Sequence, residues 1–423
     1  MVSAGPRKGR LLGTACVLIT AGILIAGLWP LNFKPVNKVE WIGNGNGIGF
    51  YGQGMVVSRQ PLEFTTIDPE NGSITIELMV RPNRESNHTV TSILTLYDYN
   101  FEQFVIGHWR THLAVRVPSS AAGNHKRYRE IGVSNVLTKD VTHLITLVSE
   151  KEATDIYIDG KLKAHLPNFS LVTDEFGLKG RLLLGNSPEG IHSWNGIFFG
   201  LAIYDRTVPG MEVRDHYLEW KKRGQQRPVV TTESTSRKRE RGVSREDAKD
   251  SKGFLNTGSA LKRSYQGRLS GSSMPIALYL FDDRDGELVR DRSGSGNDLL
   301  IPKTFKPLRR TVLGMPDNNF FFKRSNLKDI AINMAGFIPF GFFLSAWLRF
   351  AKNPTARRVY GISLFLGFCL SLVIELTQGY FPTRDSSLMD VLSNTMGTAA
   401  GILLLKYALP ILRNAKSGPM ILP

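Results

Sequence analysis

Four long apolar runs constrain this sequence of 423 residues more than any other feature. They cover residues 11–30, 330–348, 359–377 and 388–412. A bilayer core of about 30 Å is crossed by about 20 apolar residues in a helix, so each run is long enough to span a membrane. We therefore predict a polytopic membrane protein with four transmembrane helices.

The first run has the basic flank of a secretory signal peptide, because Arg7, Lys8 and Arg10 precede it. A signal peptide usually has a shorter apolar core and ends at a small-x-small cleavage site. Here the run ends in Trp29-Pro30-Leu31-Asn32-Phe33, an aromatic edge typical of a membrane interface. We predict an uncleaved anchor, with residues 1–10 as the cytoplasmic N-terminus and 11–33 as the first transmembrane helix.

Basic residues predict how the four runs are oriented. The connection 349–358 carries four positive charges and no negative ones, and Arg413 and Lys416 follow the last run. Short cytoplasmic loops are enriched in Lys and Arg, so these clusters and the N-terminal one should share one side. We predict that both termini are cytoplasmic and that residues 34–328 are extracytoplasmic.

The overall charge points to an anionic partner, since the sequence contains 53 basic residues and only 37 acidic ones. Residues 221–273 are rich in Arg, Lys and Ser and poor in large apolar residues, so we expect a disordered basic linker. Outside a membrane, contact with anionic lipid or a cell-wall polymer fits better than nucleic-acid binding, and a merely soluble linker remains an alternative. Only Cys16 and Cys369 occur, both in apolar runs, which excludes a disulfide framework and a cysteine-ligated zinc site.

Residues 38–220 predict an all-β sandwich, because short alternating runs are separated by turns. Asp159-Gly160 lies between two such runs and is a strong hairpin signal. Three phrases resemble the LamG-like, or concanavalin A-like, jelly roll: ITIELMVRP (74–82), DIYIDGKL (155–162) and LLLGNSPEGIHSWNGIFFGLAIYDRTV (182–208). Residues 274–325 contain a further β-rich segment that could complete this sandwich and lead back to the membrane.

The resemblance implies either a binding domain or a β-glucanase. Glucanase relatives carry Glu-x-Asp-x-x-Glu on one strand, which supplies the acid and the nucleophile, and this sequence lacks that triplet. We therefore expect binding of a glycan or a protein rather than catalysis. Trp109, Trp194 and Tyr204 are the candidates for stacking on a ligand, but core or edge packing is the favoured interpretation for each of them. We expect no cofactor; some relatives bind calcium, but no distinctive ligand string occurs here, and 282–286 favours an acidic turn.

The last three runs contain polar residues that are costly in a bilayer. Ser371, Glu375 and Gln378 fall on one helical stripe, and Asp390, Asn394, Gly397 and Gly401 fall on another. With Asn333 and Arg384, these residues should meet near the outer membrane surface. The cluster is either a ligand or proton site or a set of hydrogen bonds that holds the helices together, and Gly397 and Gly401 permit close helix packing.

These same residues resemble the VanZ-like membrane family. The matching phrases are NMAGFIPFGF (333–342), SLVIELTQ (371–378) and RDSSLMDVLSNTMGTAAG (384–401). The resemblance implies a bacterial inner-membrane protein with a three-helix VanZ-like region over 328–415, into which a LamG-like domain is inserted after the first helix. The family takes its name from teicoplanin resistance, and no reaction follows from it.

Two functions remain open at this point. The first is a cell-envelope protein with an outward-facing polar site and a recognition sandwich, in contact with membrane lipids and a cell-wall glycan, a lipid-linked precursor or an envelope protein. The alternative is a membrane enzyme on a lipid-linked or cell-wall substrate, with Glu375, Asp390 and Arg384 as acid, base and anion clamp. A transporter is a weak third reading, because four helices show no inverted repeat.

Overall fold

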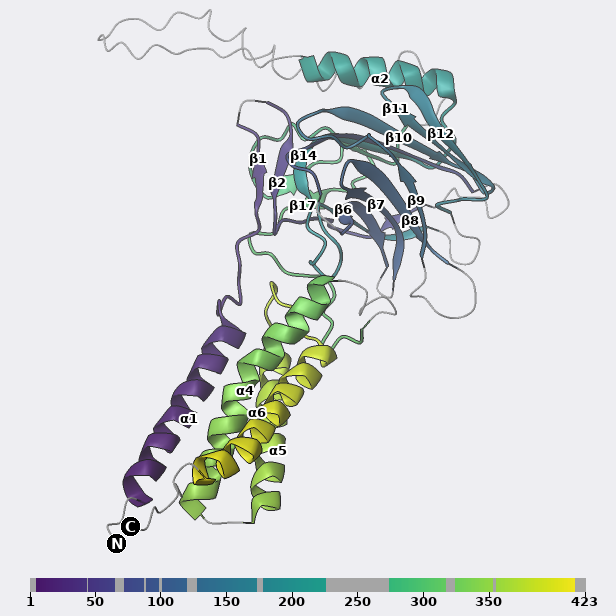
Figure 1. Cartoon of the computed structure of the whole chain (residues 1–423). Coiled ribbons are helices and arrows are strands. Elements are labelled where there is room, and N and C mark those ends of the chain that lie inside the picture. The colour runs from purple at the N-terminus through teal and green to yellow at the C-terminus, as the bar shows by residue number, and fades with distance from the viewer. Residues whose placement is uncertain are drawn as a thin grey trace, which may run out of the picture. The chain divides into compact units, whose positions relative to one another are not determined.

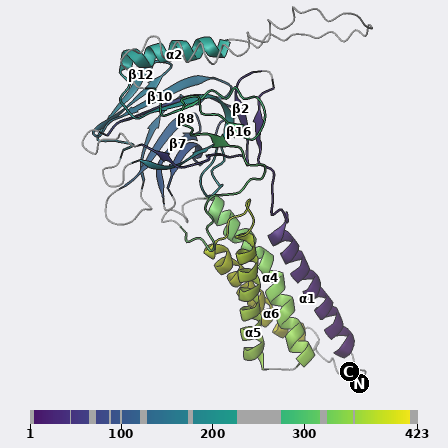
Figure 2. The same cartoon turned by 180° about the vertical axis from the view of Figure 1, so that it is seen from behind.

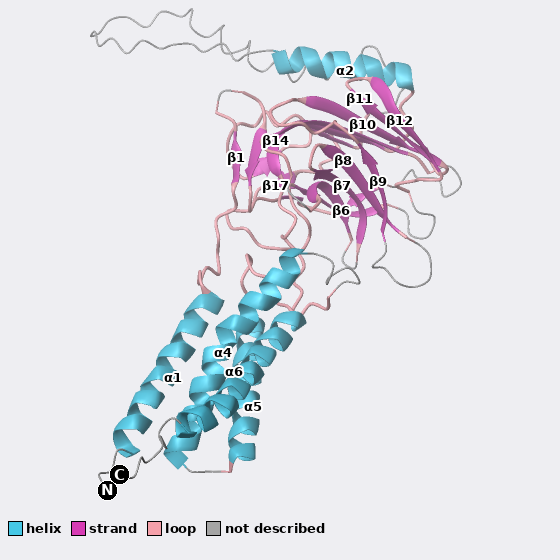
Figure 3. Ribbon diagram, viewed as in Figure 1, coloured by secondary structure: helices cyan, strands magenta, loops and turns pink. Residues whose placement is uncertain are grey.

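The computed structural model describes residues 5–43, 45–64, 72–86, 89–98, 101–119, 128–172, 178–225, 274–316, 324–352 and 355–414. The chain divides into two compact units (Figure 1). One unit contains Met1–Pro35, Glu189–Ile191 and Lys306–Pro423, and the other contains Val36–Pro188 and His192–Phe305. The strands lie in the second unit and the long apolar helices in the first (Figure 3).

The strand-rich unit is a sandwich of two antiparallel sheets (Figures 1 and 2), which confirms the predicted fold class. The first sheet contains, in spatial order, β1 (Val39–Trp41), β2 (Ile48–Tyr51), β14 (Asn195–Tyr204), β5 (Ile74–Pro82), β10 (His143–Ser149), β11 (Ala153–Ile158) and β12 (Lys161–Pro167). The second contains β16 (Leu288–Val289), β17 (Leu299–Leu300), β3 (Val56–Ser58), β13 (Lys179–Leu184), β6 (Thr91–Tyr97), β7 (Glu102–Trp109), β8 (His112–Pro118) and β9 (Tyr128–Val133), with β4 (Leu62–Glu63) beside β13.

The core lies between the two sheets and consists mainly of branched and aromatic side chains that alternate along the strands. On β5, Ile74, Ile76, Leu78 and Val80 all point into it and are fully buried. The predicted hairpin at Asp159-Gly160 is confirmed, since both residues have positive φ and Ile158 pairs with Lys161. Such φ values match the strand twist in a two-residue hairpin.

The segment after residue 273 contributes strands to both sheets. β15 (Ala277–Tyr279) pairs with β14, and β17 pairs with β3. Asp291 organises the turn that follows, because its carboxylate accepts the backbone N–H groups of Leu278, Ser293 and Asn297. Residues 226–273, which hold most of the predicted disordered linker, lie outside the described residues.

A helix replaces the start of that predicted linker. α2 (Gly210–Gln225) covers the outer face of the first sheet (Figure 2), so the expectation of irregular chain from residue 221 is wrong there. Val213 and Trp220 pack with Leu144 and Tyr204 in a second apolar cluster. The strand pattern did not indicate this helix, because its sequence is largely polar and only a narrow stripe is buried.

The other unit is a bundle of four helices: α1 (Gly5–Leu28), α4 (Arg324–Lys352), α5 (Ala356–Gln378) and α6 (Leu388–Asn414). All four are long and apolar enough to cross a membrane, and α4 continues through Pro339 as one helix. α4 and α6 pack closely, because glycines lie where they cross. A Cβ at Gly397 would clash with the backbone of Met334, and one at Gly401 would clash with Ile338.

Candidate functional site

The polar residues of the membrane helices gather at one end of the bundle, which we call the loop end. There α1 ends at Leu28, α4 begins at Arg324, and the loop 379–387 joins α5 to α6. The opposite end, which holds the α4–α5 connection, we call the turn end. Residues 29–35 follow α1 and precede Val36, where the sandwich unit begins, and residues 306–316 follow Phe305, where that unit ends.

Two amide–partner pairs join neighbouring helices in this cluster. Asn333 on α4 donates its side-chain N–H to Asp390 on α6, with 2.8 Å between Nδ2 and Oδ1. Asn394 on α6 donates to the Ser371 hydroxyl on α5 at 2.9 Å, and both residues are buried. The predicted stripes on α5 and α6 therefore face each other and are linked by hydrogen bonds.

Glu375 lies at the centre of the loop end and is only 2% exposed. Its Oε2 accepts the backbone N–H of Ser387 at 2.9 Å, just before the first turn of α6. Gln378, one turn further along α5, donates its amide N–H to the Gly27 carbonyl at 2.7 Å. The cluster therefore ties α5 to both α1 and α6.

Arg384 projects from the loop 379–387 to the end of α1. Its guanidinium donates to the backbone carbonyl of Trp29, and its positive charge also acts on the Glu375 carboxylate. Within the described chain, Arg384 has no carboxylate ion pair. All six predicted cluster residues thus come to the loop end: Asn333, Glu375, Gln378, Arg384, Asp390 and Asn394.

A short segment that the sequence did not single out pairs with the loop 379–387. We call residues 310–316 the strap. Gly314 donates its N–H to the Ser386 carbonyl at 2.8 Å and accepts the Leu388 N–H at 3.1 Å. The Leu313 N–H donates to the buried Ser386 hydroxyl at 3.1 Å, and Arg310 donates to the Tyr380 carbonyl at 3.0 Å. These residues carry no periodic pattern, so no local signal would have found the strap.

Exposed aromatic side chains surround the loop end. Trp29 and Tyr380 are each 66% exposed, and Phe33 stacks against Phe381 with ring centroids 4.6 Å apart. Trp and Tyr are typical of the boundary between lipid and water. The turn end instead carries Arg349, Arg357 and Arg358.

In the sandwich, two of the three predicted ligand-stacking residues are core residues. Trp194 is fully buried between the sheets, and Tyr204 is 1% exposed beneath α2. Neither ring can stack on a ligand, so the structure agrees with the favoured interpretation, core packing, for both residues. Trp109 at the end of β7 is partly exposed, with Arg110 over its ring at 5.1 Å and His112 edge-on at 5.2 Å.

Glu77, the strand carboxylate nearest in position to a glucanase motif, has a structural role. It is fully buried, and its oxygens accept from His216 at 2.8 Å and from the Trp220 indole at 3.1 Å. Burial alone would lower the pKa of His216, but the hydrogen bond and charge of Glu77, with the charge of Glu212, raise it. These contacts fasten α2 to β5 and leave Glu77 inaccessible to a substrate.

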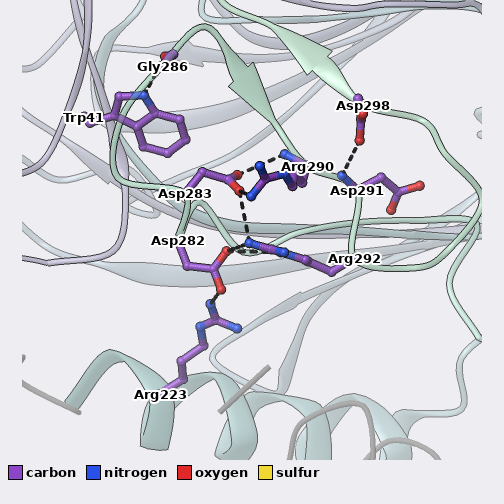
Figure 4. Close-up of polar contacts among 9 residues, drawn as sticks. All are labelled: Trp41, Arg223, Asp282, Asp283, Gly286, Arg290, Asp291, Arg292 and Asp298. Carbon is purple, nitrogen blue, oxygen red and sulfur yellow. Dashed lines mark hydrogen bonds and ion pairs between the residues drawn. The ribbon is translucent and has the colours of Figure 1, made fainter. Parts of the chain in front are cut away.

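The acidic turn after β15 is occupied by arginines. Asp282 contacts Arg292 at 2.7 Å and Arg223 at 3.3 Å, and Asp283 contacts Arg292 at 3.0 Å (Figure 4). Their carboxylates act as ion-pair partners that join α2 to the turn. Among the described residues, no group of three or more His, Cys, Asp or Glu side chains is arranged to hold a metal.

Helices of membrane-spanning length and a two-sheet sandwich define a membrane protein that carries a lectin-like domain. The VanZ/LLP1 family model matches residues 278–412, and the model of the Concanavalin A-like lectin/glucanases superfamily matches residues 58–214. Both predicted resemblances are confirmed. The VanZ/LLP1 match begins within β15, so it includes the last strands of the sandwich as well as α4, α5 and α6. No curated protein matches the chain.

Solved structures similar to the chain cover less than half of it. The receptor binding domain of botulinum neurotoxin C/D mosaic serotype is 12% identical with a TM-score of 0.34, over 44% of this chain and 45% of that chain. The SAP-like pentraxin from Limulus polyphemus is 13% identical with a TM-score of 0.30, over 43% and 82%. The chain spans about half the length of the toxin domains it matches, and at scores this low these similarities carry no argument about function.

Proposed function

We propose that this chain is a bacterial cell-envelope receptor of the cytoplasmic membrane. In this proposal the sandwich binds a glycan outside that membrane, and the loop end of the bundle presents its polar cluster to the same side. One observation supports the proposal: Glu375, Asp390 and Arg384 all lie at the loop end, where hydrogen bonds to Ser387, Asn333 and Trp29 hold them in place.

The charge distribution supports this orientation. Arg349, Arg357 and Arg358 lie at the turn end, and the basic residues Arg7, Lys8 and Arg10 lie in the first turns of α1, which also starts there. Because basic residues are retained in the cytoplasm, the turn end and both termini should be cytoplasmic. The loop end and the sandwich are then extracytoplasmic.

The charges in the cluster favour a binding site over helix packing alone. Asn394 and Gln378 each link two helices through a neutral partner, the Ser371 hydroxyl and the Gly27 carbonyl, whereas Asn333 pairs with the Asp390 carboxylate. Neutral pairs of this kind are sufficient to hold a bundle together. Ionisable groups cost about 2.5–3.5 kcal/mol at the centre of a bilayer and less near the interface, so Glu375 and Asp390 need a further reason to be there.

A membrane enzyme is the second candidate, with Glu375, Asp390 and Arg384 acting on a lipid-linked or cell-wall substrate. The observation that favours it is that the two carboxylates come from different helices yet interact electrostatically, with a guanidinium nearby. A link to teicoplanin-type glycopeptide resistance rests only on the family description and belongs to the same proposal.

Glycan-array binding by the full-length protein in lipid nanodiscs tests the receptor. We expect binding of cell-wall glycans that Trp109→Ala weakens, while Leu162→Ala, another exposed side chain of the sandwich, leaves it unchanged. Absence of any glycan binding by well-folded protein would refute the sandwich half of the proposal.

Substitution of the two carboxylates tests the bundle half. Glu375→Gln and Asp390→Asn keep the shape and hydrogen-bonding capacity of each side chain but remove its charge. For a site that serves glycopeptide resistance, we expect expression of the wild-type protein to raise teicoplanin tolerance. Both variants should insert and purify normally without raising it. Loss of folded protein in both variants would instead assign the cluster to helix packing.

A further inference from the structure

The strap and the loop 379–387 bring two arginines to the loop end. Neither forms an ion pair with a described carboxylate, although the Arg384 charge acts on Glu375 from a distance. Arg310 and Arg384 are both exposed. Each donates to a backbone carbonyl, Arg310 to Tyr380 and Arg384 to Trp29. Within the described chain neither has an ion pair, so both positive charges are available to a ligand.

The two arginines belong to one small surface. Arg310 Nη1 lies 3.0 Å from the Tyr380 carbonyl, and the Arg384 backbone N–H donates to the next carbonyl, that of Phe381, at 3.3 Å. Phe381 stacks on Phe33. We call the exposed members of this set the arginine–aromatic surface: Trp29, Phe33, Arg310, Tyr380 and Arg384. Phe381 is itself buried.

The chemistry of this surface selects an anion at the boundary between lipid and water. Exposed Trp29 and Tyr380 side chains favour the depth of lipid headgroups. Guanidinium groups bind phosphate through several N–H donors at once, and the bond used for a carbonyl leaves other donors available. The carbonyl contacts also hold each side chain in place, which lowers the entropy cost of binding.

We propose that the arginine–aromatic surface binds the phosphate group of an anionic lipid, and that Arg310 and Arg384 are the two residues that contact this phosphate. This inference deepens the proposed function and rests on it, because it gives the polar cluster a lipid-borne ligand at the extracytoplasmic surface.

Native mass spectrometry of the full-length protein in detergent tests this site. The probes are phosphatidylglycerol, a polyprenyl diphosphate, inorganic diphosphate and an uncharged diacylglycerol. We expect both anionic lipids to bind at least tenfold more tightly than diacylglycerol. We expect Arg310→Gln and Arg384→Gln each to weaken that binding about tenfold, which is the effect of one charge-assisted contact.

The comparison among these probes also distinguishes the two possible sources of the phosphate, a lipid-linked precursor and a phospholipid. If the polyprenyl diphosphate binds more tightly than phosphatidylglycerol, the natural ligand is a lipid-linked precursor. If the two lipids bind equally, the site recognises phospholipid headgroups in general. Inorganic diphosphate that competes as well as the lipids would show that the aromatic side chains contribute nothing and would overturn the lipid part of the proposal.

Matched variants keep the result interpretable. Arg357→Gln removes the same charge at the turn end and should leave binding unchanged. Arg310→Lys keeps the charge and should retain part of the affinity, and it serves if Arg384→Gln does not fold. Equal affinity losses in Arg310→Gln and Arg357→Gln would overturn the proposal. Because glycan binding is measured separately, failure of the sandwich to bind a glycan leaves this result intact.

Discussion

At the scale of single residues, the helix bundle depends on glycines that have no room for a side chain. Gly341 lies against the Thr398 backbone, and Gly367 lies against the Thr398 side chain. Together with Gly397 and Gly401, they let α4, α5 and α6 approach closely enough for the polar pairs to form. Packing and hydrogen bonding in the bundle are therefore coupled.

This coupling predicts a strong effect of Gly397→Leu. The added side chain would collide with the Met334 backbone, which cannot move without displacing α4. We expect a destabilisation of at least about 1–3 kcal/mol, measured as loss of monodisperse protein in size-exclusion chromatography and a lower midpoint of thermal unfolding. Gly361→Leu is the matched control, since nothing lies within 4 Å of its added Cβ. Equal behaviour of the two variants would contradict the packing argument.

His216 predicts a pH dependence of the sandwich. Its folded-state pKa is raised above the ordinary value of 6.5 by Glu77 and Glu212, against the effect of burial. A raised pKa means that the protonated form contributes stability fully below about pH 6.5 and loses it as the pH rises through the folded-state value. We expect the unfolding midpoint, followed by tryptophan fluorescence, to fall as the pH rises above 6.5.

Substitution separates this effect from general alkaline destabilisation. His216→Ala leaves the Glu77 charge buried without its partner and should cost about 3–5 kcal/mol near neutral pH, with a flatter pH profile. His165→Ala is the control, because its ion pair with Asp155 is exposed. A wild-type profile that does not fall above pH 6.5 would exclude His216 as the cause.

At the scale of elements, the contact between the strap and the loop 379–387 gives a direct test of how the loop end is held together. Two backbone hydrogen bonds and one to the Ser386 hydroxyl hold it against the loop, and the same loop supplies the Ser387 N–H to Glu375. A displacement of the strap would therefore move Ser386 and, with it, the adjacent Ser387 N–H that Glu375 accepts.

Ser386→Ala removes the hydroxyl that accepts the Leu313 N–H. A buried donor without a partner costs about 1–3 kcal/mol, so we expect the Leu313 and Gly314 amides to exchange with deuterium at least tenfold faster. Hydrogen–deuterium exchange with mass spectrometry measures this directly. Thr383→Ala, in the same loop, should leave both rates unchanged. Unaltered exchange in Ser386→Ala would mean that the strap is held by other contacts.

At the scale of the whole molecule, the orientation of the bundle decides where every proposed site lies. Met315 in the strap and Thr355 at the turn end are both exposed and belong to opposite ends of the helices. Their positions make a labelling experiment possible in a protein whose two native cysteines, Cys16 and Cys369, are replaced by alanine.

We expect Met315→Cys to react with a membrane-impermeant maleimide in right-side-out vesicles, because the loop end should face outward. Thr355→Cys should react only after the vesicles are permeabilised. Mass spectrometry of the labelled peptides provides the readout. The reverse pattern would place the polar cluster at the cytoplasmic surface and would remove the basis for the proposed receptor.

Local sequence patterns were sufficient to predict the four helices and many of the strands. Length and hydropathy alone indicate the four helices, and alternation indicates strands such as β5 and β10. The spacing of Ser371, Glu375, Asp390 and Asn394 also identifies the facing stripes, because a helix repeats every 3.6 residues and a polar group in lipid must find a partner. These features depend on near neighbours in the chain, so a single sequence contains them.

Only the tertiary structure decided which side chains are buried and which residues far apart in the sequence contact each other. Trp194 and Tyr204 could have been exposed on a sheet face, and only the second layer and α2 bury them. Glu77 meets Trp220 across 143 positions of sequence, and Arg384 meets Trp29 across 355. A strand or helix pattern states which face of an element is apolar, but the identity of the element that covers that face is set by the packing of the whole chain.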